Sequence, residues 1–369
     1  MKKLQLDFSE VSGSHPIWIG NEILGQLGSL LKKTIPPGKG FVIADDRLRN
    51  VAEDLVVSLE KSRWKLKVIF VTVSESLKEF KNIYPLYGEL LRLGADRDSV
   101  IFALGGGVVG DIAGFVAGTY LRGIRWVGVP STLLAQVDSS VGGKTGVNHS
   151  LGKNLIGVFH QPSAVICDTA LLRTLTFRDR LSGLGEMIKI GLTFDPVLYQ
   201  SLVMGWQDLL TISPGSPPFP STWERPIEKC LLWKSKMVKE DLRDTLGMRE
   251  ALNFGHTLGH ALEAESKYGT FRHGEAVILG MRMANLLAVS RGHLKAREHS
   301  KIDAFLSVLP VPKIPKSVKT VRLIERLKWD KKSKNQQVRF VLLQSIGKVI
   351  LDSGVKNDEV QEAIESFRK

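Results

Sequence analysis

Three of the eight histidines fall within eighteen residues of the chain, and they are the first residues that suggest chemistry. His256-Thr257-Leu258-Gly259-His260 places two imidazoles four residues apart, which puts them on one face of a helix. His273 follows where we expect another helix to begin. Glu186 lies in an otherwise apolar helix, where a carboxylate is costly unless it is paired or bound to a cation.

Two histidines and one carboxylate, with one position left for a substrate, are the ligand set of a catalytic zinc-type site. The spacing leaves open whether His256 or His260 joins His273. Each histidine taken alone is more typical of a hydrogen-bonded core residue. Because they are clustered with Glu186, a metal site and a set of core histidines are equal alternatives at this point.

A glycine-rich turn is the second feature with chemical meaning. Gly105-Gly106-Gly107-Val108-Val109-Gly110-Asp111 follows an apolar strand and opens a helix. Glycines allow close approach of a phosphate, and the N-terminus of the helix offers N–H groups and a positive dipole. A dinucleotide fold usually has an acid about twenty residues further on, but Pro130 lies there. Asp45 and Glu75, at the ends of earlier strands, are the acids we expect to hold a ribose.

Three lysines lie in apolar or glycine-rich surroundings and are candidates for anion binding: Lys144, Lys153 and Lys189. Most of the 51 lysines and arginines are more typical of a solvated surface. The excess of basic over acidic residues, a net charge of +13, suits a small anionic substrate.

Alternating strands and helices are predicted for the first half of the chain. The apolar strand runs are 41–44, 67–73, 99–104, 125–129 and 164–168, with helices at 48–61 and 80–93. This order predicts a parallel sheet with helices on both faces.

Helical periodicity dominates beyond about residue 177. Helices are predicted at 180–192, 227–240, 253–267, 274–291, 318–328 and 357–367, a loop at 213–220, and a hairpin from 338–343 and 348–351. We therefore predict an α/β nucleotide-binding domain over 1–176, a mainly helical domain over 177–369, and an active site in the cleft between them.

Composition excludes several classes of protein. The chain of 369 residues is 43% hydrophobic, which is typical of a globular protein with a substantial core. No basic tail or aromatic-basic interleaving favours nucleic acid. The N-terminal residues lack the apolar core of a signal peptide, and the glycines of 100–121 argue against a membrane span. Cys167 and Cys230 show no pairing pattern. We expect a soluble, cytoplasmic protein.

Taken together, five motifs resemble the 3-dehydroquinate synthase family. They are the glycine-rich turn at 105–111, LLAQVDSSVGGK at 133–144, GKNLIG at 152–157, NFGHTLGH at 253–260 and HGEA at 273–276. The resemblance extends from about Ile17 to Gly347 and is densest from 99 to 191.

This resemblance implies a Rossmann-like nucleotide-binding domain followed by a helical metal-binding domain, in a homodimer. It implies the conversion of 3-deoxy-D-arabino-heptulosonate 7-phosphate to 3-dehydroquinate and phosphate, the second step of the shikimate pathway. The cofactors would be NAD⁺ and one divalent metal, Zn²⁺ or else Co²⁺. The chemistry would be transient oxidation of an alcohol, elimination of phosphate, reduction, ring opening and aldol closure.

The family motifs also imply a role for particular residues. The metal ligands would be Glu186, His256 and His273. His260 would instead contact the substrate or its phosphate, and Asp138, Lys189 and Asn253 would orient hydroxyls beside the metal. Lys144 and Lys153 would lie where the substrate meets the nicotinamide.

The remaining implied contacts bind the substrate and NAD. The substrate residues would be Arg122 (from a partner subunit), Asn154, Lys234, Arg249, and Lys331 or Lys332. The NAD residues would be Asp45, Glu75, Lys78, Gly106, Gly107, Val108, Val109, Gly110, Asp111, Ser131, Thr132, Lys144, Lys153, Leu171, Leu172, Arg173 and Thr174.

The chain departs from the family pattern in a few places. Ser74 stands where glycine is usual, Ser131 stands where threonine is usual, and one extra residue near Leu246 makes Lys236 an alternative to Lys234. Three other functions compete with the synthase: another sugar-phosphate cyclase, a metal- and NAD-dependent polyol dehydrogenase, and a basic binding protein without catalysis. The last leaves Glu186 and the histidines unexplained.

Overall fold

A computed structural model describes residues 1–8, 13–211, 223–241, 248–266, 269–334 and 339–368, with side chains except at 6–8, 13–14, 248 and 328–334. The chain divides into two compact units. The first is Met1–Leu175 with Ile212–Ser235, and the second is Thr176–Thr211 with Lys236–Lys369. The predicted loop at 213–220 lies outside the described residues.

The first unit contains a seven-stranded sheet in the order β1-β2-β9-β6-β5-β3-β4. The five predicted strands are confirmed as β3 (Lys39–Asp45), β4 (Lys65–Val71), β5 (Val100–Gly105), β6 (Arg125–Pro130) and β9 (Ala164–Asp168). They pair in parallel. Two strands that the sequence patterns did not predict, β1 (Lys2–Phe8) and β2 (Gly13–Gly20), pair antiparallel with each other at one edge, and β2 is parallel to β9.

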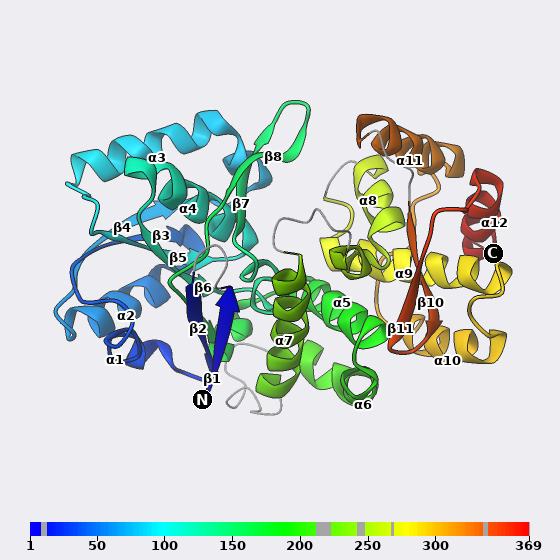
Figure 1. The fold of residues 1–369 in the computed structure, drawn as a ribbon, viewed down its shortest axis with the longest axis horizontal. Helices are drawn as coiled ribbons and strands as arrows, with labels where there is room; N and C mark the ends of the chain where they lie inside the picture. Colours follow the sequence, from blue (N-terminus) through cyan, green and yellow to red (C-terminus); the bar gives the residue numbers. More distant parts are fainter. Residues whose placement is uncertain (9–12, 212–222, 242–247, 267–268, 335–338, 369) are drawn as a thin grey trace. The chain divides into compact units, whose positions relative to one another are not determined.

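Helices cover both faces of this sheet, as predicted (Figure 1). Alternate residues of β3 belong to different cores: Val42 and Ala44 to one, Phe41 and Ile43 to the other. The first core is completed by α1 (Leu27–Leu31) and α2 (Arg49–Glu60). The second is completed by α3 (Phe80–Arg92) and α4 (Gly107–Thr119). The first unit is therefore a three-layer α/β domain.

The strand order contains a point at which the connections reverse direction. After β3 the chain adds β4 on one side of it, and then returns to add β5 on the other side. Parallel sheets bind ligands beside the carboxyl ends of the strands at such a switch point. Asp45 ends β3 and Gly105 ends β5, so the predicted ribose acid and the glycine-rich turn flank this position.

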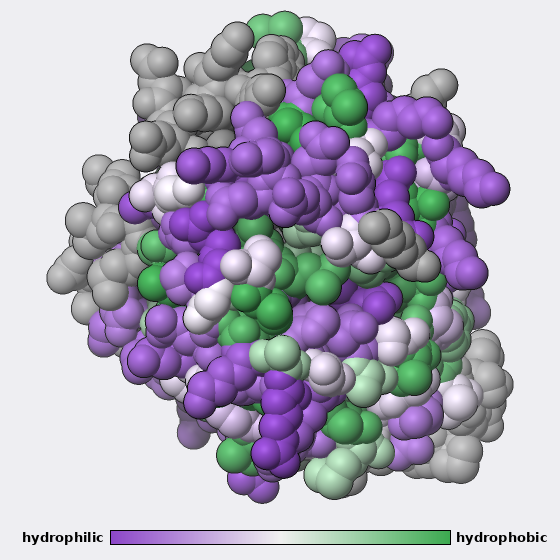
Figure 2. Space-filling view, turned by 90° about the vertical axis from the view of Figure 1, so that its right-hand side faces the viewer, coloured by the Kyte–Doolittle hydropathy of each residue, from purple (hydrophilic) through white to green (hydrophobic). Residues whose placement is uncertain are grey.

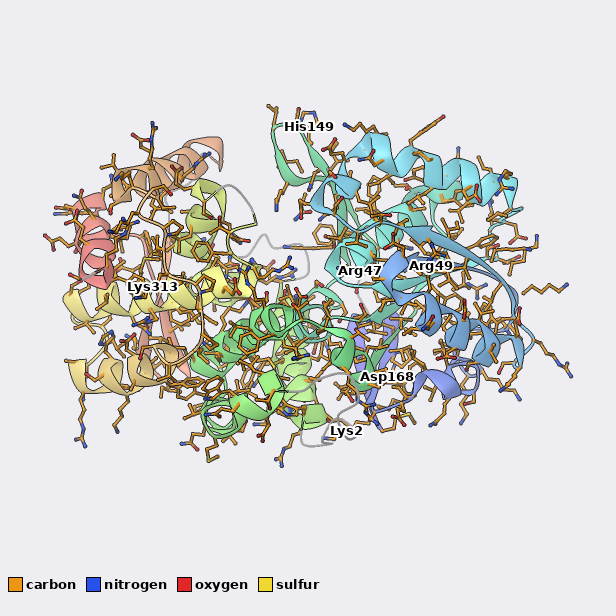
Figure 3. The ribbon with its side chains drawn as sticks, turned by 180° about the vertical axis from the view of Figure 1, so that it is seen from behind. Lys2, Arg47, Arg49, His149, Asp168 and Lys313 are labelled. Atoms are coloured by element: carbon orange, nitrogen blue, oxygen red, sulfur yellow. The ribbon has the colours of Figure 1, made fainter. Side chains whose placement is uncertain are left out.

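A separate hairpin is formed by β7 (Lys144–His149) and β8 (Gly152–Phe159). His149 lies at its tip (Figure 3). Most residues of β8 are exposed, including the apolar Leu155 and Phe159. A strand without a buried face has no alternating hydrophobic pattern, which is why the sequence did not reveal it.

The second unit is mainly helical, as predicted. Its helices are α5 (Phe177–Thr193), α6 (Pro196–Thr211), α8 (His256–Glu265), α9 (His273–Ser290), α10 (Ala296–Leu306), α11 (Thr320–Lys334) and α12 (Asn357–Arg368). The predicted hairpin is present as β10 (Phe340–Ser345) and β11 (Lys348–Asp352). Helix α7 (Glu224–Glu240) begins in the first unit.

One face of the second unit is mostly polar. Figure 2 faces the right-hand side of Figure 1, and hydrophilic residues cover most of that face, with hydrophobic residues in small patches between them. Among the helices that the structure describes, none has the length and apolar character that a bilayer span requires.

Helix α9 lies at the centre of the second unit and packs against α5, α8, α10 and α12. It approaches α5 so closely that a Cβ atom on Gly274 would lie 1.8 Å from the carbonyl oxygen of Ser182. On the side of α8, a Cβ on Gly280 would lie 2.0 Å from the carbonyl oxygen of Gly255. These glycines let α5 and the start of α8 pack closely against α9, in the region that carries Glu186, His256 and His273.

Candidate active site

Three helices of the second unit bring one carboxylate and three histidines together. Glu186 projects from α5 and is 1% exposed. Its Oε1 lies 3.5 Å from Nε2 of His256, at the start of α8, and 3.4 Å from Nε2 of His273, at the start of α9. Nitrogen atoms of His256, His260 and His273 all lie within 4.8 Å of one another. The clustering inferred from the sequence is therefore present.

The charges in this cluster are strongly coupled. Burial by itself raises the pKa of Glu186, but the Lys189 ammonium and the neighbouring histidines outweigh it and hold that pKa well below the usual value. Burial and the Lys189 charge lower the pKa of His256 well below its usual value. Burial opposes a charge on His273, but its contacts with Glu186 and Glu263 prevail and raise its pKa to about 10.

The other ring nitrogens of His256 and His273 have partners of their own. Nδ1 of His256 lies 3.3 Å from the carbonyl oxygen of Phe254. Nδ1 of His273 lies 3.2 Å from Oε2 of Glu263. Both rings thus present Nε2 to Glu186. Glu263 was missed in the sequence, although its position seven residues after His256 places it on the same helical face as His256 and His260.

Other predicted residues of the second unit surround this cluster or lie next to it in the chain. Lys189 forms an ion pair with Glu186 one helical turn away, and both side chains are almost fully buried. Arg249 and Asn253 lie in a short 3₁₀ helix (Met248–Asn253) just before His256, and Arg249 is buried. Lys331 and Lys332 lie on α11, but their side chains are outside the described set.

The glycine-rich turn adopts the predicted strand–turn–helix form. Gly106 is the N-cap of α4, and in the described part of the chain no side chain caps this helix. A Cβ on Gly106 would lie 3.0 Å from Cγ2 of Thr132, and one on Gly107 would lie 3.2 Å from Oγ of Ser139. The glycines therefore keep the backbone N–H groups of the first turn open to a ligand.

A pocket in the first unit opens beside this turn. Besides the three glycines of 105–107, its lining includes Asp111, Pro130, Ser139 and Lys144. Ser131 and Thr132 follow directly after β6, where Thr132 Oγ1 accepts a hydrogen bond from the N–H of Ala135 at 3.1 Å. Val108, Val109 and Gly110 belong to the first turns of α4.

Several predicted NAD and substrate residues form one polar network. Lys78 Nζ pairs with Asp111 Oδ2 at 2.5 Å and donates to Asn154 Oδ1. Glu75 Oε1 lies 3.4 Å from Lys153 Nζ, and it accepts a hydrogen bond from Asn148 at 2.8 Å. The network joins the 3₁₀ turn Glu75–Lys78 to α4 and to the β7–β8 hairpin.

The carboxyl ends of β3 and β9 carry the next predicted residues. Asp45 is buried, and Arg47 (labelled in Figure 3) donates to both of its carboxylate oxygens. Leu171, Leu172, Arg173 and Thr174 form the 3₁₀ turn Thr169–Thr174 after β9. Asp168, which the sequence did not single out, accepts from the N–H groups of Glu22, Leu24 and Ala170 and joins this turn to the N-terminal segment.

Asp138 and Lys234 meet in the first unit. Asp138 lies in a π-helical turn (Ala135–Ser139), a distortion that often occurs at functional sites. Lys234 Nζ is 2.7 Å from Asp138 Oδ1 and donates to its carbonyl oxygen. Arg122 is exposed and has a left-handed backbone conformation, with φ of 71°.

Comparison with known proteins places this chain in a family. Residues 68–182 match the family model of the 3-dehydroquinate synthase N-terminal domain, and residues 183–333 match that of the C-terminal domain. The chain belongs to the 3-dehydroquinate synthase family. It is 43% identical over 338 residues to 3-dehydroquinate synthase of Geobacillus kaustophilus, covering 91% of this chain and 90% of that protein. It is 37% identical over 362 residues to that of Desulforamulus reducens, with 98% of each covered.

The fold also matches that of a solved structure. The crystal structure of 2-deoxy-scyllo-inosose synthase complexed with carbaglucose-6-phosphate, NAD⁺ and Co²⁺ matches with a TM-score of 0.86, covers 99% of both chains and is 24% identical in sequence. This likeness supports the Rossmann-like first unit and the helical second unit predicted from the sequence.

Proposed function

We propose that this protein is a 3-dehydroquinate synthase, which converts 3-deoxy-D-arabino-heptulosonate 7-phosphate to 3-dehydroquinate and phosphate. The observation that carries the proposal is the convergence of Glu186, His256 and His273 in a chain that belongs to this family over nearly its whole length. In this proposal, as predicted from the sequence, residues 1–176 bind NAD and residues 177–369 bind the metal and the substrate.

The residues of the second unit fit a divalent metal. Both carboxylate oxygens of Glu186 are buried; Oε2 pairs with the Lys189 ammonium, and Oε1 faces the Nε2 atoms of His256 and His273. Two Nε2 atoms are directed at the same carboxylate, and their Nδ1 atoms have other partners. One carboxylate and two imidazoles suit Zn²⁺ or Co²⁺ with a position left for substrate. We assign Glu186, His256 and His273 as the ligands, and His260 to the substrate or phosphate side.

The residues of the first unit fit a dinucleotide. The uncapped N-terminus of α4 and its glycines provide a cradle for a diphosphate. Asp45 lies across the switch point and is the acid for a ribose. Figure 3 shows Asp168 near the N-terminal strands, consistent with a structural role for this acid and not a cofactor role.

The proposed chemistry needs both groups. The metal would supply Lewis acidity to a substrate hydroxyl, and NAD⁺ would supply a reversible hydride acceptor. The protein's own contribution is to position and neutralise an anionic substrate. Lys144 and Lys153 would lie beside the reacting carbons, and Asp138, Lys189 and Asn253 would orient hydroxyls. The departing phosphate can itself take the proton that elimination releases.

Cationic side chains would hold the two anionic ends of the substrate. Lys234 and Arg249 would bind the carboxylate; both are buried, so their charges act in a medium of low dielectric. Asn154, His260 and Lys331 or Lys332 would bind the phosphate. Lys234 is paired with Asp138 in this structure, so substrate would have to share or exchange that contact.

We also propose that the enzyme is a cytoplasmic homodimer, in which Arg122 of the partner subunit completes the phosphate site. Arg122 is exposed, and the β7–β8 hairpin exposes Leu151, Leu155 and Phe159, which supports an interface there. Cys167 and Cys230 are buried thiols, which suits a reducing compartment.

The identity of the product tests this function. The zinc-loaded protein is incubated with NAD⁺ and 3-deoxy-D-arabino-heptulosonate 7-phosphate, and phosphate, 3-dehydroquinate and NADH are measured. A synthase releases equal amounts of phosphate and 3-dehydroquinate with no net NADH. Net NADH would favour a polyol dehydrogenase. Turnover of sedoheptulose 7-phosphate or glucose 6-phosphate instead would favour another cyclase.

A further inference from the structure

We propose that Glu263 is a positioning residue for the metal centre: through Nδ1 of His273 it holds that ring so that Nε2 faces Glu186. This inference rests on the proposed function, because it assumes that His273 binds the metal. It assigns a role to a residue that none of the family motifs used above contains.

The geometry of His273 carries the argument. Glu186 Oε1 lies 3.4 Å from Nε2, and Glu263 Oε2 lies 3.2 Å from Nδ1. The two carboxylates thus occupy opposite sides of one imidazole. An ionised Glu263 carboxylate has no proton to donate and can only accept, so in the neutral His273 ring the proton belongs on Nδ1 and the lone pair on Nε2 remains for a metal.

The position of Glu263 in the fold makes the contact specific. Helix α8 carries His256, His260 and Glu263 on one face, and α9 presents His273 to that face. One helix therefore provides a proposed ligand and also the carboxylate that orients the proposed ligand of its neighbour. His256 obtains the equivalent contact from the carbonyl oxygen of Phe254. The Phe254 carbonyl belongs to the backbone and cannot be removed by substitution, whereas the Glu263 side chain can, so the contact with His273 is the one that mutagenesis can test.

Helix α8 also offers a matched control. Glu265 lies two residues further along, and its side chain is 19% exposed, against 16% for Glu263. Its partner is Arg326 at 3.4 Å, not a histidine of the cluster. Glu265→Ala removes a carboxylate of the same helix and similar burial without touching His273.

The experiment measures metal affinity in the apo full-length protein. Zinc dissociation constants are obtained by competition with a chromophoric chelator, for wild type, Glu263→Ala, Glu263→Gln and Glu265→Ala. The visible absorption of the Co²⁺-loaded proteins reports ligand geometry. Urea unfolding of each apo protein and NAD⁺ binding confirm that the variants are folded.

We expect Glu263→Ala to weaken zinc binding by about 10–100-fold and to alter the Co²⁺ spectrum. Glu263→Gln retains an oxygen that can accept from Nδ1, so it recovers part of the affinity. Glu265→Ala binds zinc like wild type. If Glu263→Ala loses stability and does not fold, the Glu263→Gln affinity and spectrum decide the question alone.

Two results would overturn the inference. One is wild-type zinc affinity and an unchanged Co²⁺ spectrum in both Glu263 variants, even if their unfolding changes, because the carboxylate would then have only a structural role. The other is equal weakening by Glu265→Ala, which would point to the general loss of charge on α8. Failure of the wild-type protein to bind zinc would instead refute the metal centre of the proposed function.

Discussion

Gly274 allows α9 to approach α5 closely, and Gly274→Ala tests whether this close approach positions the residues of the proposed metal centre. The added Cβ would lie 1.8 Å from the carbonyl oxygen of Ser182 and 2.6 Å from its carbonyl carbon. Such contacts are essentially never shorter than 3.0 Å, so the two helix backbones must separate by about 1.2 Å. No side-chain rotation can relieve the clash, because the atoms on both sides belong to backbones.

The expected cost has two parts. Overpacking a well-packed core costs about 1–3 kcal/mol, and a clash between two backbones belongs at the upper end of that range. Separation of the helices also breaks the buried hydrogen bond from the N–H of Gly274 to Ser182 Oγ, at 3.0 Å, which costs about 1 kcal/mol. We therefore expect Gly274→Ala to lower the free energy of unfolding by about 4 kcal/mol. Because His273 is the adjacent residue, zinc affinity should fall as well.

The assay is urea unfolding of the apo protein, followed by zinc titration of the folded fraction. Gly205→Ala is the matched control, since Gly205 lies within α6 of the same unit and a Cβ there would meet no atom within 4 Å. Replacing a helical glycine by alanine in open space should stabilise by about 1 kcal/mol. If Gly274→Ala were as stable as wild type and bound zinc equally well, the close approach of α9 and α5 would not be what positions His273.

Two further predictions concern buried titratable groups. Burial lowers the pKa of His15 from 6.5 to about 4, so between these pH values the folded state binds fewer protons than the unfolded state. The contribution of the neutral imidazole to the free energy of unfolding is therefore complete above about pH 6.5 and is lost as the pH falls towards 4. This shift in pKa corresponds to about 3 kcal/mol. Between pH 7.5 and 4 the free energy of unfolding should therefore fall further for wild type than for His15→Gln. Parallel pH profiles of the two proteins would refute the lowered pKa of His15. Lys189→Met leaves Glu186 buried without its ammonium partner, which should cost the apo protein about 3–5 kcal/mol. Saturating zinc should reduce that cost, and an equal loss in urea unfolding with and without zinc would show that Glu186 does not meet the metal.

Much of the first unit could be predicted from the sequence, because β3, β5, β6 and β9 are almost fully buried and appear as short apolar runs, and the edge strand β4 is also largely apolar. β1 and β8 do not appear as apolar runs: β1, at an edge, alternates apolar Leu4, Leu6 and Phe8 with polar residues, and β8 is mostly exposed. α10 was missed for a similar reason: its buried residues, Ile302, Phe305 and Leu306, lie only at its end.

The candidate site was predictable where local spacing carries the chemistry. His256 and His260 share one helix face, and Glu186 is conspicuous as a carboxylate within an apolar helix. The choice between His256 and His260 was not predictable from spacing, because it depends on which nitrogen faces Glu186 after three helices have packed. Glu263 was missed because its contact with His273 joins two helices.

The most direct test of the proposed metal centre is the release of phosphate from 3-deoxy-D-arabino-heptulosonate 7-phosphate by wild type and Glu186→Gln, each measured with bound zinc, after chelation and after zinc is restored. Glu186→Gln keeps the shape of the side chain but removes the buried charge that two histidines face. We predict that wild type releases phosphate only with the metal, recovers when zinc is restored, and forms no net NADH, while the variant stays folded, binds NAD⁺ and releases none. Full phosphate release by Glu186→Gln, or by chelated wild type shown to be free of metal, would contradict the assignment of Glu186, His256 and His273 as the centre of this enzyme.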